Sequence, residues 1–350
     1  MISYLTLQRL PYAFAILAVF SCPVFGQQGA PRGSTAYDTV ALTKFLDKAG
    51  EELGPLRTVI VAHNGEIIAE RGYHGHSVTA PTNIKSVSKS IISALVGIAI
   101  ERGEIDGVSA AIAPYFPSLE AEGVDPRKKE ITVEDLLTMR SGLESTSSRN
   151  YGAWVRSRNW VRYALTREML GPPGLRMTYS TGNTHLLSAL LTKATGKSTW
   201  QFAQDELAEP LGFTLARWPR DPQGIYFGGN DMEMTPRQMM AFGRLYLNGG
   251  RVDGRQVVPE EWVKESWVAR TRSRWGDDRL YGYCWWIREM AGYPVFYAWG
   301  YGGQFIFCVP ELELVVVATS SISSDGRRGH LGAVYDLVER LVVEPVAMAD

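Results

Sequence analysis

The stretch 83–100, NIKSVSKSIISALVGIAI, constrains the fold more than any other part of this 350-residue sequence. Its second half, from Ile91 to Ile100, is almost entirely apolar. A helix that is apolar around most of its circumference belongs in the interior of a domain rather than on its surface. The polar side chains gather at the beginning of the stretch, where burial starts: Ser86, Ser88, Lys89 and Ser90.

Composition and charge indicate an ordinary globular protein. The chain is 45% hydrophobic and 21% charged, and it is long enough for a large core or two lobes. It carries 36 basic and 37 acidic residues, for a formal net charge of -1. This balance leaves no electrostatic footprint for nucleic acid or for an anionic membrane surface. We therefore expect the partner to be a small molecule or a peptide.

The first 26 residues have the layout of a secretory signal peptide. Arg9 precedes an apolar run over 10–20, and Val24 and Gly26 place short side chains where a signal peptidase requires them. The run is too short to span a bilayer comfortably. We expect cleavage near Gly26, export to the periplasm or the medium, and no stable membrane insertion afterwards. A lipid anchor at Cys22 and a buried N-terminal helix are less favoured alternatives, because neither fits the flanking residues and prolines as well.

The cysteines are too few for a disulfide framework. If Cys22 leaves with the signal peptide, Cys284 and Cys308 remain, each in a strand-like stretch. Two buried free thiols are the favoured interpretation, and a single bridge is the alternative if the two strands are neighbours.

The order of the elements indicates an α+β fold whose sheet is built from both ends of the chain. Two β-prone runs flank Asn64-Gly65, a dipeptide typical of a type I′ hairpin turn, and short β-rich runs recur over 281–320. We expect an antiparallel sheet of about five strands, flanked by terminal helices, with a mostly helical lobe inserted in the middle. The expected boundaries are 1–26 for the signal peptide, 27–120 and 236–350 for the sheet domain, and 121–235 for the helical lobe.

Ser86 and Lys89 can do chemistry together. Three residues apart on a helix, their side chains project from the same face, one turn apart. A lysine at the entrance of an apolar helix is partly desolvated, which favours its neutral form and makes it a candidate base for the serine hydroxyl. The same spacing also arises by chance, as a helix cap beside a solvated lysine, so the pair alone does not decide the function.

Five ordered blocks of sequence add to this pair. They are SVSKS, ITVEDLLTMRSGL, MTYSTGNTHLLSALL, NDMEMTPRQMMAFGRLYLNGG and WGYGGQFIFCVPELELVVVATS. Together, over about residues 55–340, they resemble the penicillin-recognising serine hydrolases: class C β-lactamases, D-Ala-D-Ala carboxypeptidases and related esterases. The 6-aminohexanoate-dimer hydrolase branch is the most similar. The resemblance implies a β-lactamase/transpeptidase-like fold, with no cofactor and no metal.

The resemblance implies roles for three residues. The Ser-x-x-Lys motif falls on Ser86 and Lys89, as nucleophile and base. The Tyr-x-Asn motif falls on 179–181, so Tyr179 takes part in proton transfer, and we expect its phenol to ionise readily near the ammonium. Threonine replaces the motif asparagine, which weakens any clamp on a substrate amide unless Asn183 takes its place.

The sequence departs most from the family pattern at the third motif, Lys-Thr-Gly on an edge strand. Counting back from Pro310 sets Ala298-Trp299-Gly300 on it, so the resemblance implies an oxyanion hole made by the backbone N–H groups of Ser86 and Tyr301. A register shifted by three would use Gln304 instead. The motif lysine, which holds the substrate carboxylate of penicillins and peptidyl-D-alanine, is absent in either register, and this argues against an efficient β-lactamase.

Several further residues are weaker candidates. Tyr151 aligns with a loop tyrosine that contacts the leaving amine in the nylon-oligomer hydrolases, and an incidental loop aromatic is the equal alternative. Trp299 and Gly300 are expected to contact substrate, whereas most other tryptophans belong to the core. His74 and His76 have no third ligand at useful spacing, so we expect no metal site. His185 is expected to cap or pack. 

The sequence thus predicts a secreted serine hydrolase that cleaves an ester or amide of a small molecule through an acyl-enzyme on Ser86. Esterase activity is favoured, with 6-aminohexanoate-oligomer-type amidase activity second. A β-lactamase or D-Ala-D-Ala carboxypeptidase is an alternative within the family. A catalytically weak ligand-binding or sensor protein of the same fold is the alternative from another class.

Overall fold

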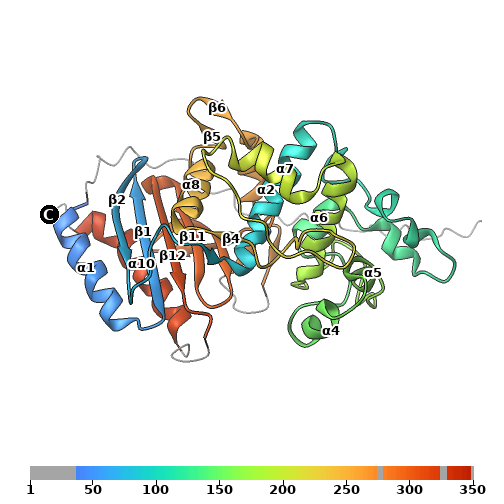
Figure 1. Ribbon diagram of the computed structural model, residues 1–350, viewed down its shortest axis with the longest axis horizontal. Coiled ribbons are helices and arrows are strands. Elements are labelled where there is room, and N and C mark those ends of the chain that lie inside the picture. Colours follow the sequence, from blue (N-terminus) through green and yellow to red (C-terminus); the bar gives the residue numbers. More distant parts are fainter. Residues whose placement is uncertain (1–36, 274–278, 324–328, 348–350) are drawn as a thin grey trace, which may run out of the picture. The chain divides into compact units, whose positions relative to one another are not determined.

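An eight-stranded antiparallel sheet organises the computed structural model, which describes residues 37–273, 279–323 and 329–347 (Figure 1). Its strand order is β2-β1-β12-β11-β10-β9-β8-β7, so the first two strands pair with the last one. The strands of this sheet are β1 (Leu56–His63), β2 (Glu66–Gly72), β7 (Thr271–Arg272), β8 (Leu280–Tyr281), β9 (Trp286–Met290), β10 (Tyr293–Gly300), β11 (Gln304–Val309) and β12 (Leu314–Ser320). Two short antiparallel pairs lie outside it: β3 (Thr82–Asn83) with β4 (Glu233–Met234), and the hairpin of β5 (Arg251–Val252) with β6 (Arg255–Gln256).

Along the chain, the helices fall into a set near the two ends and a set between β2 and β7. They are α1 (Thr39–Glu52), α2 (Ser88–Glu101), α3 (Val133–Leu137), α4 (Tyr151–Val155), α5 (Trp160–Leu165), α6 (Thr181–Thr195), α7 (Thr199–Ala203), α8 (Pro236–Leu247), α9 (Glu260–Ser266) and α10 (His330–Ala347). One-turn helices occur at η1 (Lys85–Val87), η2 (Ala113–Tyr115), η3 (Pro117–Glu120), η4 (Pro126–Glu130), η5 (Ser148–Asn150), η6 (Gln204–Ala208) and η7 (Pro310–Leu312).

The two faces of the sheet are covered by different helices. Along β11, Phe305 and Phe307 pack against the Tyr335 ring of α10, with ring centroids 5.3 and 6.0 Å away. The alternate residues Ile306 and Cys308 face α8, where Gly243 leaves room for them. Because successive strand side chains point to opposite faces, a strand buried on both sides reads as a continuous apolar run. This explains why β11 and β12 are buried along their whole length.

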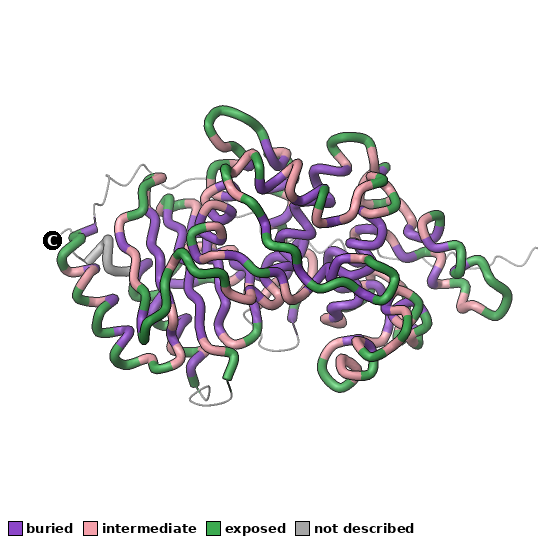
Figure 2. The backbone as a smooth tube through the Cα atoms, viewed as in Figure 1, coloured by how far each residue is buried: buried purple, intermediate pink, exposed green. Residues whose placement is uncertain are grey.

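Helix α2 is the central buried helix that the sequence predicts. Every residue from Ser88 to Ala99 is buried, and the purple tube through α2 in Figure 2 follows this stretch. The helix ends at Glu101, and the chain then turns at Gly103 with a positive φ of 71°. The prediction of an interior helix over this stretch is confirmed.

Other local predictions are also confirmed. Asn64 and Gly65 join β1 to β2 with φ of 48° and 81°, as a type I′ turn requires. Helix α6 ends at Gly196 in the left-handed conformation. The expected α+β class is correct, whereas the expected number of about five strands is too low. The two-residue strands β7 and β8 are too short to show an alternating pattern in the sequence.

The two cysteines in the described part of the chain are free and buried, as expected. Cys308 lies in β11, but Cys284 does not lie in a strand: it has a φ of 61° in the turn between β8 and β9. Burial raises the pKa of the Cys284 thiol to about 12, which keeps it protonated and unreactive at neutral pH.

The predicted signal peptide, its cleavage site and Cys22 lie outside the described residues. Within the described ranges, no helix combines the length and the apolar character needed to cross a bilayer.

Packing around α2 gives a testable prediction. A Cβ on Gly97 would lie 2.3 Å from Cγ of the Trp262 ring, which is itself buried. Although replacing a helical glycine with alanine normally stabilises a helix, Gly97→Ala should lower the free energy of unfolding by about 1–3 kcal/mol because of this overlap. Denaturant unfolding followed by circular dichroism measures the difference.

The matched control is Gly332→Ala in α10, where nothing lies within 4 Å of the added Cβ. This substitution should leave the protein as stable as before or stabilise it by about 0.5 kcal/mol. Equal effects at the two glycines would contradict the packing described for α2.

Candidate active site

Ser86 and Lys89 lie where the chain enters the buried helix. Ser86 belongs to the 3-10 turn η1, and Lys89 is the second residue of α2, which η1 precedes directly. Their side chains meet: Lys89 Nζ lies 3.0 Å from Ser86 Oγ. Lys89 is only 1% exposed, so its amine is withdrawn from water.

Tyr179 reaches the same hydroxyl from another part of the chain. It precedes α6 by two residues, and its phenol is hydrogen bonded to the Ser86 side chain. The ring lies 5.2 Å from Lys89 Nζ, measured to the centroid, and stacks on Trp286 with centroids 5.8 Å apart. The structure therefore brings together the three residues on which the sequence places the chemistry.

Two fixed acceptors hold the Lys89 amine. Nζ donates to the backbone carbonyl of Gly229 at 2.5 Å and to Thr181 Oγ1 at 3.3 Å. A neutral amine has two N–H bonds and one lone pair. With both N–H bonds directed to these acceptors, the lone pair is left for the hydroxyl proton of Ser86. The contacts thus direct the lone pair of a neutral Lys89 amine at Ser86.

Burial sets the protonation of these groups. It lowers the pKa of Lys89 to about 7, against the weaker opposing influence of Cys284 and Asp231. Burial also raises the pKa of the Tyr179 phenol above its ordinary value, although the hydrogen bond to Ser86 acts in the other direction. The expectation that Tyr179 ionises readily is therefore wrong, because burial outweighs the nearby amine, and the phenol stays protonated at neutral pH.

The end of β10 lies against the turn that carries Ser86. A Cβ on Gly300 would lie 2.3 Å from the carbonyl oxygen of Ile84 and 3.1 Å from Cβ of Lys85, so this close approach requires glycine. Pairing of β10 with β9 stops at Tyr297, and 298–300 pair with β11 alone among the described strands. Gly300 therefore lies beside the turn that carries Ser86.

Tyr301 follows Gly300 at the start of the hairpin turn and is 57% exposed. The alternative residue, Gln304, is fully buried, and its side-chain amide donates to the carbonyl of Ser320 at 2.7 Å. Gln304 is thus part of the sheet. Trp299 is half-buried, stacked on Phe305, and its ring centroid lies 5.7 Å from that of Trp286.

Tyr151 is linked to the Lys89 site through one short segment. Asn230 Nδ2 donates to the Tyr151 hydroxyl at 2.8 Å, and the preceding residue, Gly229, supplies the carbonyl on Lys89. The following residue, Asp231, pairs with Lys85 at 2.9 Å, next to the nucleophile. Tyr151 therefore contacts the residue that directly follows the one whose carbonyl binds Lys89.

A cleft of about 320 Å³ adjoins Tyr179. Its walls come from the loop 144–150, from 177–179 and from Leu170 and Ser273. Ser147 lines this cleft and also accepts a hydrogen bond from the Thr181 backbone N–H at 2.9 Å. Of Ser86, Lys89 and Tyr179, only Tyr179 lines this cleft.

Other sequence candidates lie away from this chemistry. Asn183 is buried, and its Oδ1 accepts from Ser141 Oγ at 3.1 Å. His74 and His76 are exposed near the end of β2, and the described residues contain no group of three or more side chains placed to hold a metal ion.

Sequence reasoning missed two groups in the site, the Gly229 carbonyl and the Thr181 hydroxyl. A Cβ on Gly229 would lie 2.1 Å from Thr184 Oγ1 and 3.2 Å from Lys89 Nζ, so a side chain there would block the carbonyl contact. The adjacent glycines 228–229 were the available signal. In the sequence, Thr181 was interpreted only as the loss of the motif asparagine. In the structure, its hydroxyl accepts a hydrogen bond from Lys89.

A serine hydroxyl held between a buried amine and a phenol, on an antiparallel sheet with an inserted set of helices, defines a serine hydrolase of the penicillin-recognising type. The sequence profile of the Beta-lactamase family matches residues 55–339. The chain belongs to this family.

Individual relatives are more distant. The chain is 26% identical over 294 residues to a 6-aminohexanoate-dimer hydrolase of Paenarthrobacter ureafaciens, with 75% of this chain and 71% of the relative covered. Among solved structures, EstCE1, a hydrolase with promiscuous acyltransferase activity, superimposes with a TM-score of 0.70 at 18% identity, over 86% of this chain and 99% of the other. A class C beta lactamase from Rhodobacter sphaeroides superimposes with a TM-score of 0.64 at 18% identity, over 86% of this chain and 98% of the other. These structural matches confirm the fold.

The pKa of Lys89 predicts a pH dependence. Only the neutral amine can accept the Ser86 proton, so a pKa of about 7 means that reactivity is half-maximal near pH 7, nearly complete about one unit above it, and lost as the pH falls below it. The rate of Ser86 labelling by a fluorophosphonate should drop about tenfold per pH unit below the midpoint. Mass spectrometry of samples quenched over time measures this rate.

Lys89→Met serves as the control, since it removes the base and should abolish the pH-dependent labelling. A wild-type midpoint near pH 10, the range of a solvated lysine, would contradict the burial argument.

Proposed function

We propose that this protein hydrolyses carboxylic esters of small molecules through an acyl-enzyme on Ser86. The observation that carries the proposal is the contact of a 1% exposed amine, Lys89 Nζ, with Ser86 Oγ at 3.0 Å. A weakly nucleophilic hydroxyl becomes reactive when a positioned base takes its proton as it attacks.

The first half of the reaction forms the acyl-enzyme. Ser86 Oγ attacks the carbonyl carbon while its proton passes to Lys89 Nζ. The oxyanion is held by the backbone N–H groups of Ser86 and Tyr301. Tyr179 gives its proton to the leaving oxygen, and the Lys89 ammonium restores the phenol.

The second half hydrolyses the acyl-enzyme. Water attacks the ester carbonyl and gives a proton to the neutral Lys89 amine. Ser86 Oγ then leaves with a proton that Lys89 and Tyr179 return to it. The protonated state of Tyr179 suits its part as a donor, because a phenol that stays neutral can supply a proton to a leaving alcohol.

The sequence of β10 supports a neutral substrate. This strand, YPVFYAWG, contains no basic residue, and Ala298-Trp299-Gly300 stands where the related hydrolases carry a motif lysine. Lys85, close to the nucleophile, is already paired with Asp231. On this strand, a substrate carboxylate would therefore lack the motif cation that β-lactamases and D-Ala-D-Ala carboxypeptidases provide.

A matched pair of esters tests both the reaction and its specificity. We expect turnover of p-nitrophenyl butyrate and, for the same acyl chain ending in a carboxylate, a kcat/KM lower by about tenfold or more, because the charge is desolvated without a partner. Ser86→Ala should reduce the ester turnover by about a thousandfold or more.

Turnover unchanged in Ser86→Ala would refute the proposed nucleophile. No turnover of any ester or amide by folded wild-type protein would favour the binding or sensor function instead. Preference for the anionic ester, or efficient opening of penicillins, would refute the assignment of a neutral substrate.

Amide hydrolysis is a second candidate, favoured by the link from Tyr151 through Asn230 to the Gly229 carbonyl. An amide nitrogen leaves only when it is protonated, so an extra hydroxyl near the base matters more for amides than for activated esters. The relative from Paenarthrobacter ureafaciens bears the name of an amide hydrolase, which agrees with this candidate.

Tyr151→Phe separates the two activities. If the amide activity is real, this variant should lose about tenfold or more of the kcat for 6-aminohexanoate dimer or a p-nitroanilide, while p-nitrophenyl butyrate turnover changes by less than about twofold. Equal losses on both substrates would show that Tyr151 acts only in folding or packing, and no amide turnover in wild type would remove this candidate.

A further inference from the structure

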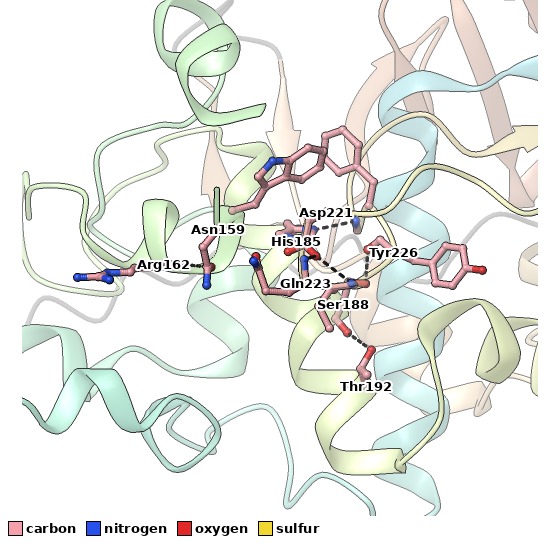
Figure 3. A network of polar contacts seen from close by, with 12 residues as sticks. Asn159, Arg162, His185, Ser188, Thr192, Asp221, Gln223 and Tyr226 are labelled. Atoms are coloured by element: carbon pink, nitrogen blue, oxygen red, sulfur yellow. Dashed lines mark hydrogen bonds and ion pairs between the residues drawn. The ribbon is translucent and has the colours of Figure 1, made fainter. Parts of the chain in front are cut away.

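A buried histidine–aspartate pair lies beneath the segment that contacts Lys89. His185, on α6, and Asp221 lie in the network drawn in Figure 3, with Nε2 and Oδ2 3.2 Å apart. Both side chains are 0% exposed, and the imidazole is enclosed by the rings of Trp154, Trp160 and Phe227. Substrate and solvent cannot reach this pair, so it does not itself perform the chemistry.

The hydrogen bonds fix the tautomer of His185. The backbone N–H of Gly228 donates to Nδ1 at 3.4 Å, so Nδ1 is the acceptor and the ring proton sits on Nε2. Nε2–H then donates to Asp221. The other oxygen of Asp221 accepts from the backbone N–H groups of Gln223 and Ile225 at 2.8 and 2.9 Å. Asp221 thereby closes the turn 221–225 and orients the imidazole.

The segment after this turn is pressed against α6. Ser188 Oγ donates to the carbonyl of Tyr226 at 2.7 Å, as the dashed contact near Ser188 in Figure 3 shows. A Cβ on Gly228 would lie 2.2 Å from the carbonyl oxygen of Thr184. The next residue, Gly229, points its carbonyl at Lys89 Nζ, 2.5 Å away. One peptide unit therefore separates the bond to His185 from the bond to the base.

We propose that His185 and Asp221 are positioning residues that hold residues 228–229 so that the Gly229 carbonyl orients the Lys89 amine toward Ser86. The inference rests on the proposed role of Lys89 as the base, and it adds the pair of residues that orients this base. It follows from the chain of contacts: Asp221 fixes the His185 tautomer, His185 accepts from Gly228, and Gly229 accepts from Lys89.

Asp221→Asn tests this with little change in shape. The turn N–H groups keep the remaining oxygen in place, so the new NH₂ group faces Nε2 and requires it to be an acceptor. The ring proton then moves to Nδ1, where it opposes the N–H of Gly228. We expect kcat on p-nitrophenyl butyrate to fall by about ten- to a hundredfold with KM within about twofold, because the base loses its orientation while the cleft is unchanged.

A second measurement needs no turnover. In protein labelled with ¹³C at lysine Cε, the Lys89 signal, identified by its absence in Lys89→Met, reports the titration of the amine directly. The proposal predicts that Asp221→Asn displaces the midpoint from its wild-type value, because the Gly229 carbonyl no longer contacts the amine in the same way. If Asp221→Asn does not fold, His185→Phe, whose ring offers no acceptor to the N–H of Gly228, should show the same displacement.

Thr58→Val is the matched control, since it deletes a buried hydroxyl pair with Thr319 at 2.6 Å in the sheet, between β1 and β12. It should change neither the kcat nor the midpoint. An unchanged Lys89 midpoint and kcat in folded Asp221→Asn would overturn the positioning role. Wild-type protein without ester turnover would refute the proposed function alone, because the titration still tests the link between the pair and Lys89.

Discussion

The architecture depends on keeping one amine, Lys89 Nζ, out of water. Burying a charged ammonium without partners costs several kcal/mol, and a buried lysine therefore shifts toward its neutral form. Here burial lowers the pKa of Lys89 to about 7, and the Gly229 carbonyl and the Thr181 hydroxyl occupy its hydrogen-bonding positions. The destabilising burial of the lysine thus leaves a large share of the amine neutral near pH 7, which is the form that the proposed base requires.

Four separate parts of the chain meet at this amine. The turn before α2 supplies Ser86, the residues at the start of α6 supply the phenol and a hydroxyl, the segment 228–231 supplies a carbonyl, and the end of β10 closes against the serine turn. Each part keeps its position through packing against the protein core rather than through local interactions alone. Rigid surroundings of this kind suit a site whose reacting atoms must stay aligned.

Local patterns made much of the fold predictable. The apolar run in α2, the Asn64-Gly65 turn and the Ser86–Lys89 spacing involve neighbours in sequence, so the sequence shows them directly. The Gly229 carbonyl lies 140 residues from Lys89 in sequence and is a backbone group, so no residue type marks it. The ionisation of Tyr179 was predicted in the wrong direction, because the burial that raises the pKa of its phenol becomes visible only once the fold is known.

Trapping of the covalent intermediate tests the central claim most directly. Wild-type protein mixed with excess p-nitrophenyl acetate, quenched in acid within the first turnover and digested, is analysed by mass spectrometry. The account predicts a burst of nitrophenol and one acetyl group on the peptide that contains Ser86. Turnover without a burst and without any acyl group on Ser86 would contradict it, since the ester would then be cleaved by another group or by directly activated water.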